Sequence, residues 1–157
     1  MKKIGLLVIA AIVIVSCTQN ANREGADNPD QNTAEASSPV RDGVFIHITE
    51  SYNDPHRVLM PLKMAVLMST DKDVIVYLDI HAVEMLVKGA KDMTYADFES
   101  FQTYIAQLSE KKVGVYACPT CLKVAGYSPE DLIEGVQVAQ KDKFFNFTEG
   151  RILTLDY

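Results

Sequence analysis

Two cysteines three positions apart, Cys118 and Cys121, form the motif Cys-Pro-Thr-Cys and are the residues best suited to chemistry in this chain. A thiolate is both a nucleophile and a metal ligand, so such a pair is compatible with disulfide exchange, sulfur transfer or metal binding. Pro119 suits the first position of a helix, and a helix that begins there would stabilise a thiolate at Cys118. We therefore predict that Cys118 is the nucleophile and that Cys121, one turn along, resolves its adducts.

The third cysteine, Cys17, belongs to a different region. A basic start precedes an apolar run of twelve residues, 4–15, which is too short to span a bilayer and is typical of a secretory signal. The residues before Cys17 resemble the lipobox of bacterial lipoproteins, in which the cysteine becomes the lipidated N-terminus. We predict a signal peptide over residues 1–16 and a lipid anchor at Cys17, with the protein in the bacterial cell envelope, periplasm-facing or surface-exposed.

Residues 17–42 carry, after Cys17, polar and small side chains without apolar periodicity, a composition that cannot bury enough surface to fold. We predict that they form a disordered tether between the lipid bilayer and a domain over residues 43–157. The net charge of −6 becomes more negative once Lys2 and Lys3 are removed, which argues against nucleic acid and anionic lipid as binding partners.

From residue 43 onward, apolar strands alternate with helices. Runs rich in β-branched residues predict two strands buried on both faces, 44–48 and 74–78, and three further strands, 113–116, 135–138 and 151–155. Helical spacing and start signals predict a helix from Pro55, a shorter one over about 81–88 and a third from Thr94-x-x-Asp97. This order is typical of an α/β fold, here a flavodoxin-like three-layer α/β/α sandwich with helices on both faces of a mainly parallel sheet of about five strands.

Function in such a sheet gathers beyond the carboxyl ends of the strands. His81 follows one strand end, and we expect it to face the cysteines, where an imidazole can act as a base or stabilise a thiolate. A cap of the next helix is an alternative role for His81. The candidate binding residues bordering the same cleft are Glu50, Tyr52, Pro119 and Thr120.

The segment CPTCLKVAGYSPEDLIEGV resembles the cysteine loop of the DsrE/DsrF-like sulfur-relay family, and most closely its YchN-like branch. The shared features are Cys-x-x-Cys, a glycine eight residues after the first cysteine (Gly126) and the LI-acidic-GV run. The resemblance covers residues 43–157 and implies an α/β/α fold, a trimer or hexamer, and sulfur carried as a persulfide on Cys118. It also implies a sulfur donor or acceptor as partner, either a protein or a small thiol. The family's tRNA-thiolation relay works in the cytoplasm. As a lipoprotein, this chain would instead act outside it.

Three other functions fit the same cysteines. A thioredoxin-type oxidoreductase would cycle them between dithiol and disulfide. In thioredoxin folds, however, the motif follows an early strand and begins a long helix, whereas here it follows the third predicted strand and precedes a short helix. A structural zinc site needs four ligands, and the cysteine pair supplies only two of them. His47 and His81 are the alternative further donors. We expect no metal site, because the cysteines alone leave the ligand set incomplete. A binding module would hold Cys118 and Cys121 as a structural disulfide. We interpret His47 as a hydrogen-bonded core histidine, and we expect no nucleotide or flavin cofactor because no Gly-rich loop follows the first strand.

Overall fold

The computed structural model describes residues 39–157. The predicted signal peptide, the lipidation of Cys17 and most of the predicted tether therefore lie outside the described residues. Five strands form one parallel sheet in the order β4-β3-β2-β1-β5. These strands are β1 (Gly43–Ile48), β2 (Asp73–Leu78), β3 (Gly114–Ala117), β4 (Val136–Val138) and β5 (Ile152–Asp156). The predicted α/β fold with a parallel five-stranded sheet is thus confirmed.

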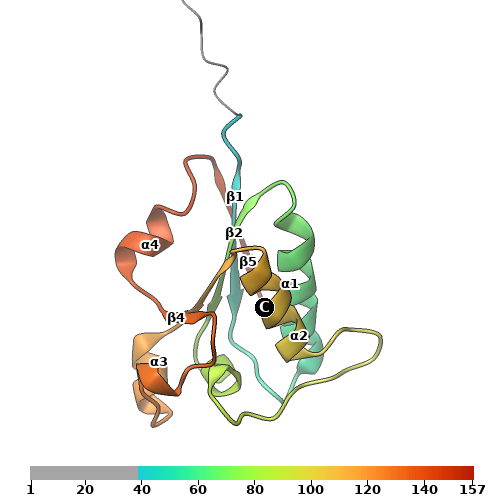
Figure 1. Ribbon diagram of the computed structural model, residues 1–157, viewed down its shortest axis with the longest axis vertical. Coiled ribbons are helices and arrows are strands. Elements are labelled where there is room, and N and C mark those ends of the chain that lie inside the picture. Colours follow the sequence, from blue (N-terminus) through green and yellow to red (C-terminus); the bar gives the residue numbers. More distant parts are fainter. Residues whose placement is uncertain (1–38) are drawn as a thin grey trace, which may run out of the picture. The chain divides into compact units, whose positions relative to one another are not determined.

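One face of the sheet carries the core. Because side chains alternate along a strand, β1 sends Val44, Ile46 and Ile48 to this face, where each is buried. Two helices, α1 (Pro55–Met68) and α2 (Phe101–Glu110), cover it, as Figure 1 shows. The side chain of Asp54 caps α1 by accepting a hydrogen bond, and Pro55 takes the first helical position, as the sequence predicts.

The opposite face is only partly covered, so the prediction that the first two strands are buried on both faces holds there for Ile75 of β2 but not for the other residues. Phe45, His47 and Tyr77 point to it and are half-buried. The short helix α4 (Lys141–Phe145), which the sequence did not predict, lies over this face with its Phe144 ring centroid 5.7 Å from that of Phe45. A five-residue helix cannot cover the area that α1 and α2 cover together, which is why this face stays partly open.

The start of α2 differs from the sequence prediction. The Thr94-x-x-Asp97 pattern predicts a helix start that the structure does not contain, since Thr94 lies exposed in a loop. The helix begins at Phe101 instead, because Ser100 caps it by accepting a hydrogen bond from the amide of Thr103 at 3.2 Å. Two possible caps close in sequence cannot be ranked by pattern alone.

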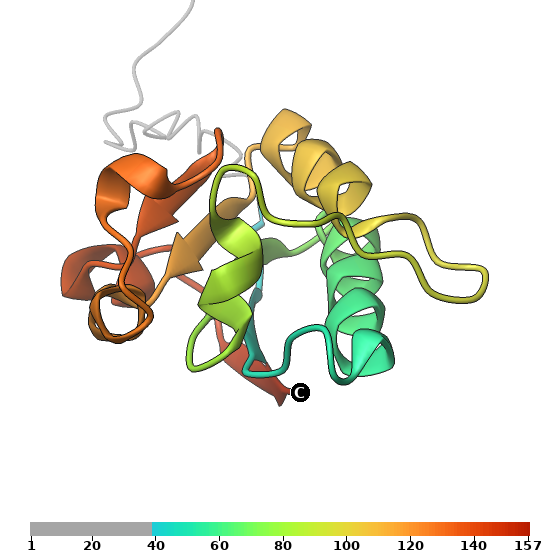
Figure 2. The same cartoon turned by 90° about the horizontal axis from the view of Figure 1, so that it is seen from below.

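The helical segments near the cysteines are short. The helix predicted over about 81–88 is a 3-10 turn, η1 (Ala82–Leu86), and α3 (Pro119–Val124) has six residues. A second 3-10 turn, η2 (Pro129–Asp131), leads toward β4. The turn η1 follows β2 and contacts α3, which follows β3, so the segments after two neighbouring strands meet (Figure 2). Among residues 39–157, no helix combines the length and apolar character that crossing a bilayer requires.

Candidate functional site

Cys118 lies directly beyond the carboxyl end of β3. Its amide donates a hydrogen bond of 3.0 Å to the carbonyl of Leu78, so the backbone of β2 holds it in place. It is the N-cap of α3, with Pro119 at the first helical position as predicted. The Cys118 sulfur accepts a hydrogen bond from the amide of Cys121 at 3.3 Å. Both cysteines are free thiols and half-buried in the described part of the chain.

The surroundings of Cys118 favour its thiolate. Burial alone would raise the pKa of this thiol, because it penalises the charged form. Hydrogen bonding outweighs the burial and leaves the pKa of Cys118 below its ordinary value. The donors are the thiol of Cys121, the hydroxyl of Tyr77 and the backbone amides of Cys121 and Thr120. Cys118 therefore carries more thiolate at neutral pH than a free cysteine does, which makes it the better nucleophile of the pair.

Cys121 is shifted in the opposite direction. Burial and the hydrogen bond that its thiol gives to Cys118 raise the pKa of Cys121, against a smaller lowering by the amide of Ile80. Ile80 has φ 47°, a left-handed conformation that is unfavourable for a β-branched residue. Ile80 lies two residues beyond the end of β2, and strained backbone of this kind is often found near functional sites.

Cys121 opens onto a cavity of about 380 Å³ between η1 and α3. His81 and Thr120 line the same cavity, so the structure brings these two predicted residues together with Cys121. His81 is exposed, and within the described chain its side chain makes no hydrogen bond that caps η1. The other lining residues are Ile80, Glu84, Val124 and Ala125.

Glu50 and Tyr52 do not line the cavity of Cys121. The hydroxyl of Tyr52 donates a hydrogen bond of 2.7 Å to the carbonyl of Lys91, and its ring lines a separate cavity of about 530 Å³. Burial and the charge of Glu84 raise the pKa of Tyr52. Glu50 lies 3.8 Å from the guanidinium of Arg57. These contacts anchor the turn after β1 rather than contact the thiols.

The sequence analysis did not single out Tyr77, which reaches Cys118 from β2. Its place inside an apolar run, V-I-V-Y-L, is typical of a core residue. The period-two alternation of β2 puts it on the face opposite Val76 and Leu78, but which residue it meets there depends on the register of β2 against β3. No sequence signal could have supplied that register.

His47 is hydrogen-bonded, as the sequence analysis predicted, but it lies half-buried on the partly open face instead of in the core. Its neighbours are a carboxylate on β5 and one directly after β2. Its Nδ1 lies 2.9 Å from Oδ1 of Asp156 in a hydrogen bond. Its Nε2 lies 3.0 Å from Oδ1 of Asp79, as an ion-pair contact without the angle of a hydrogen bond, and these two atoms have no other partner among the described residues. A row Asp156, His47, Asp79 therefore crosses the carboxyl ends of β5, β1 and β2.

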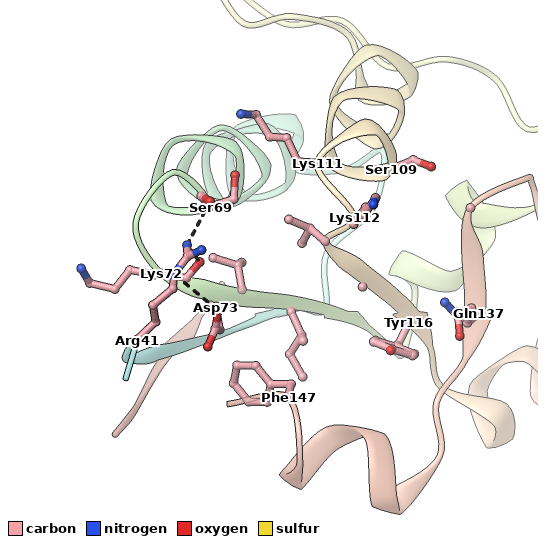
Figure 3. A pocket seen from close by; sticks show the side chains of 15 residues that line it. Arg41, Ser69, Lys72, Asp73, Ser109, Lys111, Lys112, Tyr116, Gln137 and Phe147 are labelled. Carbon is pink, nitrogen blue, oxygen red and sulfur yellow. Dashed lines mark hydrogen bonds and ion pairs between the residues drawn. The ribbon is translucent and has the colours of Figure 1, made fainter. Parts of the chain in front are cut away.

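A polar cavity of about 520 Å³ lies at the other end of the sheet, around the starts of β2 and β3 (Figure 3). Its lining includes four cationic side chains, Arg41, Lys72, Lys111 and Lys112. Arg41 donates to the carbonyl of Ser69 at 3.2 Å and lies 3.5 Å from Asp73. No cysteine or histidine is among its lining residues. The thiol chemistry therefore belongs to the carboxyl end. Within residues 39–157, no group of three or more His, Cys, Asp or Glu side chains is arranged to hold a metal ion.

Known proteins share the sequence pattern and the fold of this chain. Residues 42–149 match the model of the DsrE/DsrF-like family. The crystal structure of the ychN protein from E. coli is similar with a TM-score of 0.58 and 20% identity, over 73% of this chain and 99% of that one. A protein of unknown function from Methanobacterium thermoautotrophicum, MTH1491, has a TM-score of 0.50 and 19% identity, over 72% of this chain and 98% of its own. No curated protein sequence matches at a significant level.

Proposed function

This chain belongs to the DsrE/DsrF-like family, and from that premise we propose that it binds and transfers sulfane sulfur as a persulfide on Cys118. Membership is consistent with a sulfur relay at the level of the family. The observation that carries the proposal is the position of Cys118, which is the N-cap of α3 at the carboxyl end of β3 and whose sulfur accepts a hydrogen bond of 3.3 Å from the amide of Cys121. The directions of the two thiol pKa values, lowered for Cys118 and raised for Cys121, agree with this geometry. One thiol is thus prepared to attack while its neighbour stays protonated as a hydrogen-bond donor.

Loading is a nucleophilic displacement. The thiolate of Cys118 attacks the terminal sulfur of a donor persulfide, R–S–SH, and forms a new S–S bond. The S–S bond of the donor breaks, its electron pair leaves with the donor sulfur, and the resulting thiolate takes up a proton. Neither partner is oxidised overall, so the step needs no cofactor.

Unloading has two routes. An acceptor thiolate can attack the outer sulfur of the persulfide and restore the Cys118 thiolate. Alternatively, Cys121 loses its proton and attacks the inner sulfur, which forms the Cys118–Cys121 disulfide and releases hydrosulfide; the two cysteines are oxidised and the sulfane sulfur is reduced. Because the pKa of Cys121 is raised, this second route needs a base, and His81 on the same cavity is placed to accept the proton.

The test is intact-protein mass spectrometry of the full chain carrying Cys17→Ser, which leaves Cys118 and Cys121 as its two thiols. The reduced protein is incubated with an organic persulfide and compared with Cys118→Ser and Cys121→Ser in the same background. We expect one or more sulfur atoms to be added in the parent and in Cys121→Ser, and none in Cys118→Ser. Equal loading of Cys118→Ser would show that Cys121 is the carrier and would overturn the assignment.

The same pair of pKa values also favours a second function, a thiol–disulfide oxidoreductase with Cys118 as the attacking thiol. The two functions differ in how the parent protein reacts with a protein disulfide and with a persulfide donor. An oxidoreductase reduces a protein disulfide and becomes two hydrogen atoms lighter without gaining sulfur from the donor. A sulfur carrier gains sulfur and shows little disulfide reductase activity.

We further propose that Cys17 anchors the chain to a bilayer, that the domain assembles as a trimer or hexamer, and that its partner is a sulfur donor or acceptor, protein or small thiol. The cysteine within a lipobox-like sequence supports the anchor, and family membership supports the assembly. Cys17→Ala should leave an unlipidated precursor in the host, measured as a mass without acyl chains. Light scattering of the purified protein should give a mass of three or six chains; a monomer contradicts the assembly.

A further inference from the structure

Tyr77 lies on β2 opposite the strand that carries Cys118. The parallel register pairs Tyr77 with Tyr116 and Leu78 with Ala117. Since successive side chains alternate in direction, Cys118 follows Tyr116 on the face to which Tyr77 points. Tyr77 and Cys118 therefore lie on the same face of the sheet, on neighbouring strands, and their interaction raises the pKa of Tyr77 and lowers that of Cys118. The two residues are 41 positions apart in the chain, and they come together because β2 and β3 are neighbours.

Two aromatic neighbours hold the ring of Tyr77 in this orientation. The ring of His47 stacks on it, with centroids 5.5 Å apart and 25° between the planes. The ring of Phe144 meets it edge-on at 4.9 Å. His47 is itself fixed between Asp156 and Asp79 on the flanking strands. The ring of Tyr77 therefore cannot turn without disturbing packing on both sides.

Tyr77 is also kept in its protonated form. Burial and the interaction with Cys118 raise the pKa of its hydroxyl, and the charge of Asp79 acts in the same direction. A phenol with a raised pKa is a poor acid at neutral pH but remains a hydrogen-bond donor. It can stabilise an anion on the neighbouring sulfur, whereas it is unsuited to delivering a proton.

From this register and packing we infer that Tyr77 is a hydrogen-bond donor that stabilises the anionic sulfur of Cys118 from the neighbouring strand, in addition to the donors within the cysteine loop itself. The effect of Tyr77 on the ionisation of Cys118 stands independently of the proposed function. Only its effect on a persulfide at Cys118 rests on the proposed function. A persulfide on Cys118 also carries its charge on sulfur beside Tyr77, so the same hydroxyl favours the loaded, anionic state. The role concerns ionisation and needs no further group.

The experiment measures the ionisation of Cys118 directly. The full chain carrying Cys17→Ser is alkylated with iodoacetamide across a pH series, and modification of Cys118 is followed by peptide mass spectrometry. Tyr77→Phe removes only the hydroxyl and keeps the ring that packs on His47 and Phe144. We expect Tyr77→Phe to move the midpoint of the rate profile to higher pH and to slow alkylation about three- to tenfold near pH 6.5, with little change at the alkaline plateau.

Tyr116→Phe is the matched control, because Tyr116 lies on the same face of the sheet and its ring also packs against Phe144 at 5.6 Å. We expect this variant to keep the midpoint of the parent. An unchanged midpoint in Tyr77→Phe overturns the inference, as does an equal shift in both variants, which would mean a general loosening of the face. Because the readout is ionisation, a chain that takes up no sulfane sulfur but shows the Tyr77 shift would contradict the proposed function and leave this inference standing.

Discussion

Cys118 and Cys121 share one loop, yet each depends on the other for its ionisation. The thiol of Cys121 donates a hydrogen bond toward Cys118, which lowers the pKa of Cys118 and raises that of Cys121. In the proposed mechanism, the second cysteine acts before any disulfide forms, as a donor that favours the thiolate of the first. This reading gives Cys121 a role in loading as well as in release.

A pair of substitutions at Cys121 tests that role. Cys121→Ser keeps a hydroxyl donor, whereas Cys121→Ala removes the side-chain donor and leaves the backbone amide. We expect the alkylation midpoint of Cys118 to move to higher pH in Cys121→Ala and much less in Cys121→Ser. The shift is upward because losing a donor to the thiolate disfavours the charged form. The measurement is the same pH series of iodoacetamide alkylation, and equal midpoints in the two variants would contradict the donor role.

The comparison of the two thiols within one molecule gives a further prediction. Since the pKa of Cys118 is lowered and that of Cys121 raised, Cys118 holds the larger thiolate fraction at every pH between the two values. Limiting alkylation of the reduced chain near neutral pH should therefore label Cys118 first. As the pH rises through the pKa of Cys121, this preference should shrink. Faster labelling of Cys121 at neutral pH would show that the assignment is reversed.

At the scale of elements, the site depends on where short segments begin. The cysteine loop was predictable because Cys118 and Pro119 carry a local start signal that no neighbouring residue duplicates. The start of α2 was not predictable from the sequence, because Thr94 and Ser100 both suit an N-cap. The surrounding structure selects Ser100. An error of this kind leaves the thiols in place, since α2 packs against the core face of the sheet.

Two alanine substitutions distinguish these two caps. Ser100→Ala removes the hydroxyl that accepts from the amide of Thr103, and we expect it to lower the free energy of unfolding by about 1 kcal/mol. Thr94→Ala changes an exposed loop residue, and we expect an effect within about 0.5 kcal/mol. Urea unfolding followed by circular dichroism measures both. A larger loss of unfolding free energy for Thr94→Ala than for Ser100→Ala would indicate that Thr94, as the sequence pattern predicts, is the residue that caps the helix.

At the scale of the whole molecule, one core-bearing face supports the sheet while the other face carries the tyrosine, histidine and carboxylates of the site. The core is thus concentrated on one face, and Cys118 and Cys121 pack against its edge. Leu62 is fully buried between α1 and the sheet, whereas Leu67 in the same helix is 56% exposed. The two leucines allow the contribution of the core to be measured without touching the site.

We expect Leu62→Ala to cost about 2–5 kcal/mol of unfolding free energy, because it removes buried methyl groups and leaves a cavity. Leu67→Ala should cost far less, since its side chain is already largely in water. Both values come from urea unfolding curves with similar slopes. In a Leu62→Ala chain that remains folded, the alkylation midpoint of Cys118 should equal that of the parent. A shifted midpoint would show that the core and the site are coupled through the sheet.

The sequence by itself determined the parts of this protein that depend on neighbours along the chain. Alternating strands and helices led to the parallel α/β sheet, and the cysteine loop identified both the family and the thiols. Cys118 at the start of a helix follows from Pro119 next to it, and His81 beyond β2 follows from the rule that loops at the carboxyl ends of parallel strands meet. Each of these features is decided within a few residues or by a general property of such sheets.

Only the tertiary structure decided which side chains meet across strands. Tyr77 faces Cys118, and His47 lies between Asp79 and Asp156, because of strand order and register, which involve residues far apart in the chain. For the same reason Tyr52 and Glu50, although they follow a strand end as His81 does, contact Lys91 and Arg57 instead of the thiols. A side chain in a strand has two faces and several possible partners, and the energy that selects among them comes from packing of the whole sheet, which no local pattern contains.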